Sequence, residues 1–130
     1  MKKILIIAVA AIAIGVGAYF LFFNKPDDAE EKFYQFAIED SFISNVKDSQ
    51  KLFKTTIVLK IDKDNMDEYF KENIYIIRDT ILIILRSLTV EDISGADIME
   101  RLRVEISSAL NRELGIDNID SIYFNDFVMQ

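Results

Sequence analysis

The sequence predicts an α+β protein: an N-terminal transmembrane helix followed by a small domain in which a three- to four-stranded, mainly antiparallel sheet packs with two to three helices. Three patterns predict this class. One apolar run occupies residues 4–23, residues 52–62 alternate between apolar and polar side chains, and residues 73–88 and 97–114 repeat apolar residues at helical spacing. The expected parts are a cytoplasmic stub (1–3), the transmembrane helix (4–23), a linker (24–31) and an extracytoplasmic domain (32–130).

The apolar run Ile4–Phe23 has the length and composition of a membrane span. Its 20 residues carry no charge, and as a helix they cover about 30 Å, the thickness of the hydrocarbon layer. Its twelve Ile, Leu, Val and Phe side chains favour insertion by about 4–7 kcal/mol as an upper bound. A cleaved signal peptide is the alternative, but its apolar core is shorter, and here bulky Phe20–Phe23 follows the small residues.

Charge sets the expected orientation. Lys2 and Lys3 precede the span and four acidic residues follow it within 24–31, so the N-terminus is expected in the cytoplasm. The domain then lies outside the cytoplasmic (inner) membrane, in the periplasm or on the outside of the cell. Because only those two of the 15 basic residues precede the span, the remaining 107 residues carry 13 basic against 22 acidic side chains, a net charge of −9. Such an acidic domain is not expected to bind nucleic acid.

The chain contains no Cys, His or Trp. Disulfides, the usual zinc ligands and His-containing triads are therefore excluded, and we expect neither a cofactor nor a metal. One enzymatic alternative stays open, a carboxylate-based hydrolase of cell-wall glycan. Its candidate acids lie in polar stretches without the apolar surroundings that raise the pKa of a catalytic acid: Asp62, Asp64, Asp67, Glu68, Asp117 and Asp120.

The first elements of the domain are a helix and a hairpin. Helical spacing of apolar residues predicts a short helix around Glu30–Ile38. Ser41–Val46 and Leu52–Asp62 flank a polar turn and predict an antiparallel hairpin. The longer strand is expected to bury one face, made of Phe53, Thr55, Ile57, Leu59 and Ile61.

The middle of the domain predicts two helices. The Asp-x-Asp start at Asp62 resembles a calcium loop, but the sixth position is Asp67 instead of Gly and the twelfth is Asn73 instead of Glu. A capped loop leading into a helix near Met66–Glu72 is expected instead. Asn73–Leu88 is apolar around most of a helical circumference, so it is either a central core helix or partly a surface for a partner.

The last elements are a capped helix and a strand. Thr89-x-x-Asp92 and Ser94-x-x-Asp97 both have the spacing of N-caps, and they predict a short turn and then a long helix, Asp97–Leu114, that ends at Gly115. Its side facing water is expected to carry Arg101, Glu105, Ser108 and Arg112. Ile119–Met129 is apolar on both faces and predicts a strand in the interior of the sheet.

Several segments of the chain, in order and spacing, match one family. They are Phe42-x-x-Asn45-Val46, Ile77-Arg78-Asp79-Thr80-Ile81, Leu85-x-Ser87-Leu88-Thr89-x-Glu91-Asp92-Ile93, Leu102-Arg103-x-Glu105-Ile106, Ala109-Leu110-Asn111 and Ile122–Gln130. With the anchor layout, they resemble the FliL family of flagellar basal-body-associated membrane proteins. The motif positions, structural or interacting, are Asn45, Arg78, Asp79, Glu105, Asn111, Phe124, Phe127 and Gln130.

The resemblance implies a fold and partners. FliL-like proteins are single-span membrane proteins with an outer domain similar to the stomatin/prohibitin (SPFH) fold. They assemble, as a ring, with flagellar stator proteins of the MotA/MotB type and support torque and motility. A structural role is also open for Asn111, which could cap or bridge beneath the last strand. The alternatives are a generic envelope or pilus-type assembly scaffold and the hydrolase above.

Overall fold

The computed structural model describes residues 1–23 and 30–130, so most of the expected linker 24–31 lies outside the described residues. The chain divides into two compact units, Met1–Glu31 and Lys32–Gln130. In the first unit, α1 (Lys2–Phe23) is an unbroken helix of 22 residues, none of them buried. An 18-residue stretch of it has a mean hydropathy of 2.7, and by length and composition it is the one helix of the described chain able to cross a membrane.

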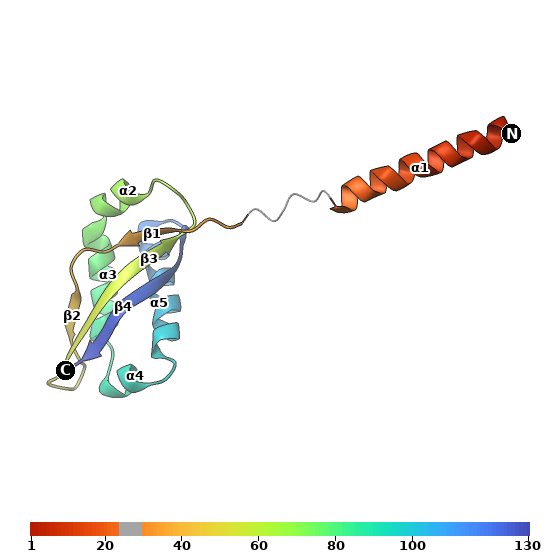
Figure 1. Ribbon diagram of the computed structural model, residues 1–130. Coiled ribbons are helices and arrows are strands. Elements are labelled where there is room, and N and C mark those ends of the chain that lie inside the picture. The colour runs from red at the N-terminus through yellow and green to blue at the C-terminus, as the bar shows by residue number, and fades with distance from the viewer. Residues whose placement is uncertain (24–29) are drawn as a thin grey trace. The chain divides into compact units, whose positions relative to one another are not determined.

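The second unit is built on a four-stranded antiparallel sheet (Figure 1). Its strands are β1 (Tyr34–Ala37), β2 (Phe42–Asn45), β3 (Leu52–Ile61) and β4 (Ile119–Met129). The long strand β3 is central: β2 pairs with its first half and β1 with its second half on one side, and β4 pairs along the other side. The predicted hairpin and the α+β class are therefore confirmed.

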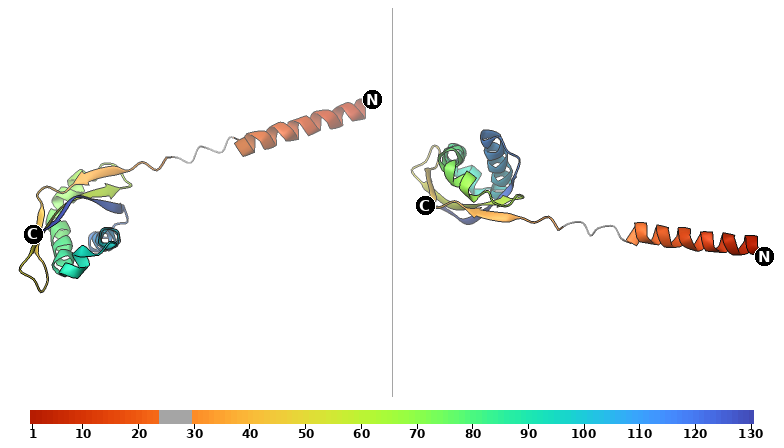
Figure 2. Two further views of the ribbon diagram at one scale, coloured as in Figure 1. Left: turned by 60° about the horizontal axis from the view of Figure 1, so that its bottom comes forward. Right: turned by 90° about the horizontal axis from the view of Figure 1, so that it is seen from above.

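Four helices accompany the sheet in the described part of this unit: α2 (Asp67–Glu72), α3 (Ile74–Arg86), α4 (Val90–Ser94) and α5 (Ile98–Leu114). The two long ones, α3 and α5, lie on one face of the sheet (Figure 2). The core fills the space between these layers. As predicted, β3 buries its odd-numbered side chains there, against residues such as Ile81 of α3 and Ile106 of α5.

The helix predicted around Glu30–Ile38 is wrong, because Tyr34–Ala37 is strand β1. Phe36 and Ile38 are both buried, at the two-residue spacing of a strand. Pairing of Gln35 with Lys60 and of the neighbouring residues with the end of β3 fixes the extended conformation. The sequence spacing of Phe33, Phe36 and Ala37 fits a helix equally well over so few residues, so the tertiary pairing decides.

The predicted interior position of Ile119–Met129 is also wrong, although its bounds are confirmed. Strand β4 pairs only with β3 among the described strands and so forms an edge. Its register shifts twice, so Asp120 and Asn125 lie opposite no residue of β3 in the strand pairing. Each β-bulge brings two residues three apart onto the same face: Ile119 with Ile122, and Phe124 with Phe127. These shifts explain why the strand is apolar on both faces when it is read at period two.

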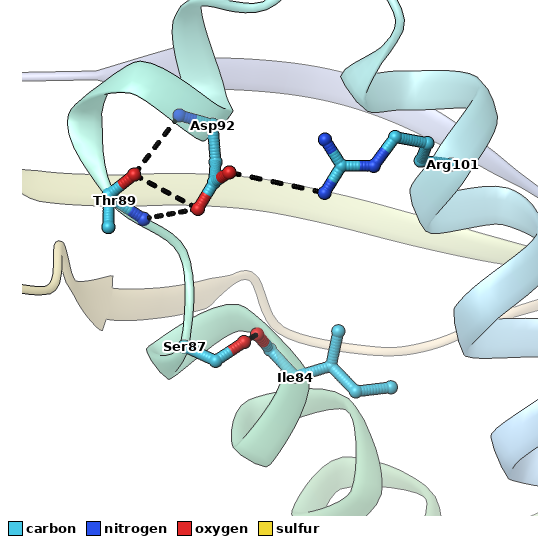
Figure 3. A network of polar contacts seen from close by, with 5 residues as sticks. All are labelled: Ile84, Ser87, Thr89, Asp92 and Arg101. Atoms are coloured by element: carbon cyan, nitrogen blue, oxygen red, sulfur yellow. Dashed lines mark hydrogen bonds and ion pairs between the residues drawn. The ribbon is translucent and has the colours of Figure 1, made fainter.

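One of the two caps predicted from the Thr89 and Ser94 spacings is present, whereas the capped loop expected before α2 is wrong, because α2 follows Met66 without a side-chain cap. Thr89 and Asp92 form a reciprocal capping box at the start of α4, with the Asp92 N–H donating to Thr89 Oγ1 (3.2 Å) and the Thr89 N–H donating to Asp92 Oδ2 (3.0 Å; Figure 3). Ser94, by contrast, is the last residue of α4, and α5 begins at Ile98 after Asp97, whose side chain forms no capping hydrogen bond. Gly115 ends α5 in the left-handed conformation (φ 66°), as predicted.

The capping box also affects the acidity of Asp92. Hydrogen bonds from the Thr89 backbone N–H and hydroxyl stabilise the carboxylate and hold the pKa of Asp92 below its usual range. Arg101 of α5 points toward the same carboxylate (4.0 Å; Figure 3) and adds to the effect. Since the folded-state pKa is lowered, this contribution to stability is present at neutral pH and is lost only as the pH falls through that lowered pKa.

Candidate interaction surface

Helix α3 is buried on one side and exposes apolar residues on the other. Ile77, Ile81 and Leu85 face the core. On the opposite side, Tyr75 is 85% exposed and Ile83 64% exposed. We call this side the α3 face; it consists of Tyr75, Ile76, Asp79, Leu82, Ile83 and Arg86. The sequence left open whether this segment is a core helix or partly a surface for a partner. In the structure one side of α3 packs in the core, and the opposite side is the candidate surface.

A groove of about 390 Å³ runs between the α3 face and strand β2. It is lined by Ile43, Ser44, Asn45, Leu52, Asp79, Leu82, Ile83 and Arg86, and we call it the α3–β2 groove. Ile43 is 60% and Leu52 47% exposed, so apolar side chains border it on the strand side as well. Among the expected motif positions, the groove brings together Asn45 and Asp79.

Arg78, next to Asp79, holds the connection between β1 and β2. Its Nη1 donates to the carbonyl oxygens of Glu39 (3.0 Å) and Asp40 (3.3 Å), and its Nη2 donates to that of Ser41 (3.3 Å). The guanidinium also lies over the Phe42 ring, 4.3 Å from its centroid. Asp40 has a left-handed backbone (φ 67°), a conformation that is uncommon for residues other than glycine, although aspartate adopts it more readily than most. Arg78 therefore fixes the start of β2 against α3.

Replacing Arg78 with alanine should destabilise the domain by about 2 kcal/mol, because three carbonyls lose a charged donor and the Phe42 ring loses its cation. Thermal unfolding of the full chain in detergent should show a melting temperature lower by about 10 °C. Arg78→Lys keeps the charge without the planar fork and should recover only part of the loss. Arg112→Ala, at an exposed position of α5, is the matched control and should change the melting temperature by less than about 3 °C.

Asn111 joins α5 to the last strand. Its Nδ2 donates to the carbonyl oxygen of Ile119 (2.9 Å), and its Oδ1 accepts from the Ile119 N–H (3.1 Å). The carboxamide thus bridges the helix to the first residue of β4, which is the structural position considered from the sequence. The pair of bonds fixes where β4 begins relative to α5.

Of the three remaining C-terminal motif positions, Phe124 and Phe127 lie in β4 and Gln130 follows its last residue. The Phe127 ring packs edge-on against the rings of Phe53 and Phe124 at the inner face of the sheet. The distances between ring centroids are 4.6 Å to Phe53 and 5.4 Å to Phe124. Gln130 exchanges two backbone hydrogen bonds with Leu52, each 2.8 Å long, and its side chain is exposed. Glu105 is exposed on α5, away from the α3–β2 groove, and it lines a shallow depression together with Asp97, Glu100, Arg101 and Val104. Packing of their rings therefore gives Phe124 and Phe127 a structural role.

A family model described as "Flagellar basal body-associated protein FliL" matches residues 35–130 of this sequence. The match covers both strands of the hairpin, the α3 face and all of β4. The chain belongs to the FliL family. The similarity proposed from the C-terminal motifs is thereby confirmed, and the matched range contains all eight expected motif positions.

A FliL-family relative is the "Flagellar protein FliL" of Aquifex aeolicus (strain VF5). It is 25% identical over 97 residues, which cover 73% of this chain and 60% of that protein. The chain thus spans about 60% of the length of the curated relative that it matches. Association with the flagellar basal body is what the description of the matched family states of that family.

The acidic loops of this FliL-family domain show no arrangement that favours the hydrolase alternative. Asp64, Asp67 and Glu68 are exposed around a hollow of about 200 Å³ lined by polar residues alone. Asp120 pairs with Lys60 (3.0 Å) in the first β-bulge. Among the described residues, no three acidic side chains gather as a metal site.

Sequence reasoning missed Ile43, Leu52 and Arg86 as parts of the α3–β2 groove. A signal for two of them exists: Ile43 and Leu52 are apolar residues on the face of the hairpin that points away from the core. An apolar pair on the solvent face of a two-faced hairpin is unusual enough to mark a candidate contact.

Proposed function

We propose that this FliL-family chain is a single-span accessory protein of the flagellar motor that associates with stator proteins of the MotA/MotB type and supports torque and motility. The family match over residues 35–130 carries this proposal. The helix α1, long and apolar enough to cross a membrane, supports attachment to the inner membrane. With Lys2 and Lys3 before it, the positive-inside tendency favours a cytoplasmic N-terminus and a periplasmic domain.

Membrane attachment also favours assembly of several copies, as a ring. Confinement to one plane raises the effective concentration of neighbouring domains, so modest contacts suffice. The exposed apolar residues of the α3 face, Tyr75, Ile76 and Ile83, supply candidate surface for contacts with copies or with the stator. Scaffolding through such contacts needs neither a cofactor nor catalytic chemistry.

Deleting the gene should reduce swimming on soft agar, most strongly at high load, while flagellar filaments still assemble. The full chain, expressed in trans, should restore the swimming radius. A fluorescent fusion should form foci at motors, and these foci should fade in cells that lack the stator. Normal swimming of the deletion strain under high load would refute the motor role.

The envelope or pilus-type scaffold is the competing function, and co-purification separates the two. Crosslinking of the full chain in its native membrane should recover stator proteins. Recovery of pilus subunits without stator proteins would favour the alternative.

A further inference from the structure

Strand β2 has a free edge along the α3–β2 groove. Val46 donates its N–H to the Lys51 carbonyl (3.0 Å), and Leu52 exchanges both of its backbone bonds with Gln130 of the chain end. The backbone N–H and C=O groups of successive residues point to opposite sides of an antiparallel strand. Since those of Val46 point to the β3 side, those of Phe42 and Ser44 do so too, while the backbone groups of Ile43 and Asn45 point away from β3. Among the described residues, these outward groups meet one partner, the Ser44 hydroxyl on the Asn45 carbonyl (3.2 Å).

This edge is short, but it has no charged side chain, proline or β-bulge that would keep another strand from pairing with it. Residues Phe42–Asn45 include no charge and no proline. The edge strand β4, in contrast, has two β-bulges and an ion-paired aspartate, Asp120, in the first of them. An added strand can therefore pair with a regular edge at β2, whereas the two bulges interrupt such pairing at β4.

Helix α3 runs in the same direction as β2. At one end, Arg78 donates to the Ser41 carbonyl, just before β2 begins. At the other end, the Leu88 carbonyl accepts from the Lys47 N–H (2.9 Å), just after β2 ends. Asp79 consequently borders the beginning of the strand and Arg86 borders its end.

Two opposite charges stand at the two ends of the groove. Asp79 and Arg86 are exposed, and neither side chain forms a hydrogen bond or an ion pair with another residue of the described chain. They lie seven residues apart on one side of α3, about 10.5 Å along the axis. Ile83 lies between them on that side. The separation is comparable to the length of three to four residues of an extended strand.

We propose that the α3–β2 groove binds an extended segment of a partner protein, which adds antiparallel to β2 and carries an acidic, an apolar and a basic residue, in that order, at alternate positions. The acidic residue pairs with Arg86, the apolar one packs on Ile83 and the basic one pairs with Asp79. Main-chain bonds to Ile43 and Asn45 hold the segment, and the charges set its direction. The short β2 limits the contact to about four residues.

A second copy of this chain does not supply such a segment. The order acid-x-apolar-x-base occurs at two places in the sequence, Asp67–Lys71 and Asp97–Arg101. Both are helical, in α2 and at the start of α5, so neither is available as a strand. The occupant is therefore a different protein.

Peptide binding to the purified full chain in detergent micelles tests this proposal, independently of any motor role. One labelled seven-residue peptide has Glu at position 2, Val at 4, Lys at 6 and Thr elsewhere; its isomer exchanges Glu and Lys. By fluorescence anisotropy the acid-first peptide should bind about tenfold more tightly than the isomer, since two favourable charge pairs become two repulsions. The double variant Asp79→Arg with Arg86→Glu should reverse this preference.

Amide hydrogen exchange supplies a second readout that surface charge alone does not move. The N–H groups of Ile43 and Asn45 should exchange more slowly once peptide is added, while those of Phe42 and Ser44 stay unchanged. Equal affinity of the two peptides, no binding of either, or protection along β4 would overturn the proposal. So would self-association that protects Ile43 and Asn45 without peptide, because a second copy would then occupy the edge.

Discussion

Replacing Phe42 with alanine is expected to destabilise the domain by about 4 kcal/mol. The Phe42 ring is fully buried, and the Arg78 guanidinium rests on it. Truncation removes the transfer free energy of the ring and leaves a cavity beneath the guanidinium. A domain of this size has a free energy of unfolding of roughly 5–15 kcal/mol, so the loss takes a large part of it. Thermal unfolding of the full chain in detergent should show a melting temperature lower by more than about 15 °C.

The adjacent residue provides the matched control. Ile43 also lies in β2, but its side chain is 60% exposed on the opposite face of the sheet. Ile43→Ala should therefore change stability by about 0.5 kcal/mol or less. Similar melting temperatures for the two variants would mean that the alternation of β2 is misplaced by one residue. Such a slip would also exchange the backbone groups that face the groove.

The sequence predicted best those elements whose pattern is long. Ten residues of β3 alternate without interruption, and the buried set from Phe53 to Ile61 follows from that alternation alone. The capping box at Thr89 and the stop at Gly115 depend on local chemistry, so their spacing was sufficient. The short β1 was misread because four residues do not distinguish a helical from an extended period, and only pairing with β3 decides between them.

The edge position of β4 and the α3–β2 groove could not be predicted from the sequence, for a different reason. The bulges at Asp120 and Asn125 shift the phase of β4, which makes an edge strand look like an interior one. The groove exists because α3 lies beside β2, a placement held by Arg78 and by the Lys47–Leu88 hydrogen bond across more than 30 residues. Of the expected motif positions, Asn111 could be assigned a structural role from the sequence, because it lies near the end of the long helix, shortly before the last strand. Asn45 and Asp79 acquire a shared surface only in the folded domain.

Two arginines in the middle of α1 should release the chain from the membrane. Ile12 and Val16 lie near the centre of the helix, where each arginine costs about 2.5–3.5 kcal/mol in insertion. Together with the lost apolar side chains, Ile12→Arg with Val16→Arg offsets the whole of the estimated 4–7 kcal/mol that favours insertion. The membrane pellet after carbonate extraction should lose most of the protein, and motility should be lost with it if the proposed function holds.

The conservative pair Ile12→Leu with Val16→Leu should remain in the pellet, because apolarity and length are unchanged. If α1 anchors the unmodified protein, a chain of 15.0 kDa should be found in the membrane fraction. If α1 were a cleaved signal peptide, a shorter chain would appear in the periplasm and the arginine variant would accumulate uncleaved instead. Gel mobility and fractionation of one culture therefore distinguish an anchor, which confines every copy to one plane, from a leader, which releases them.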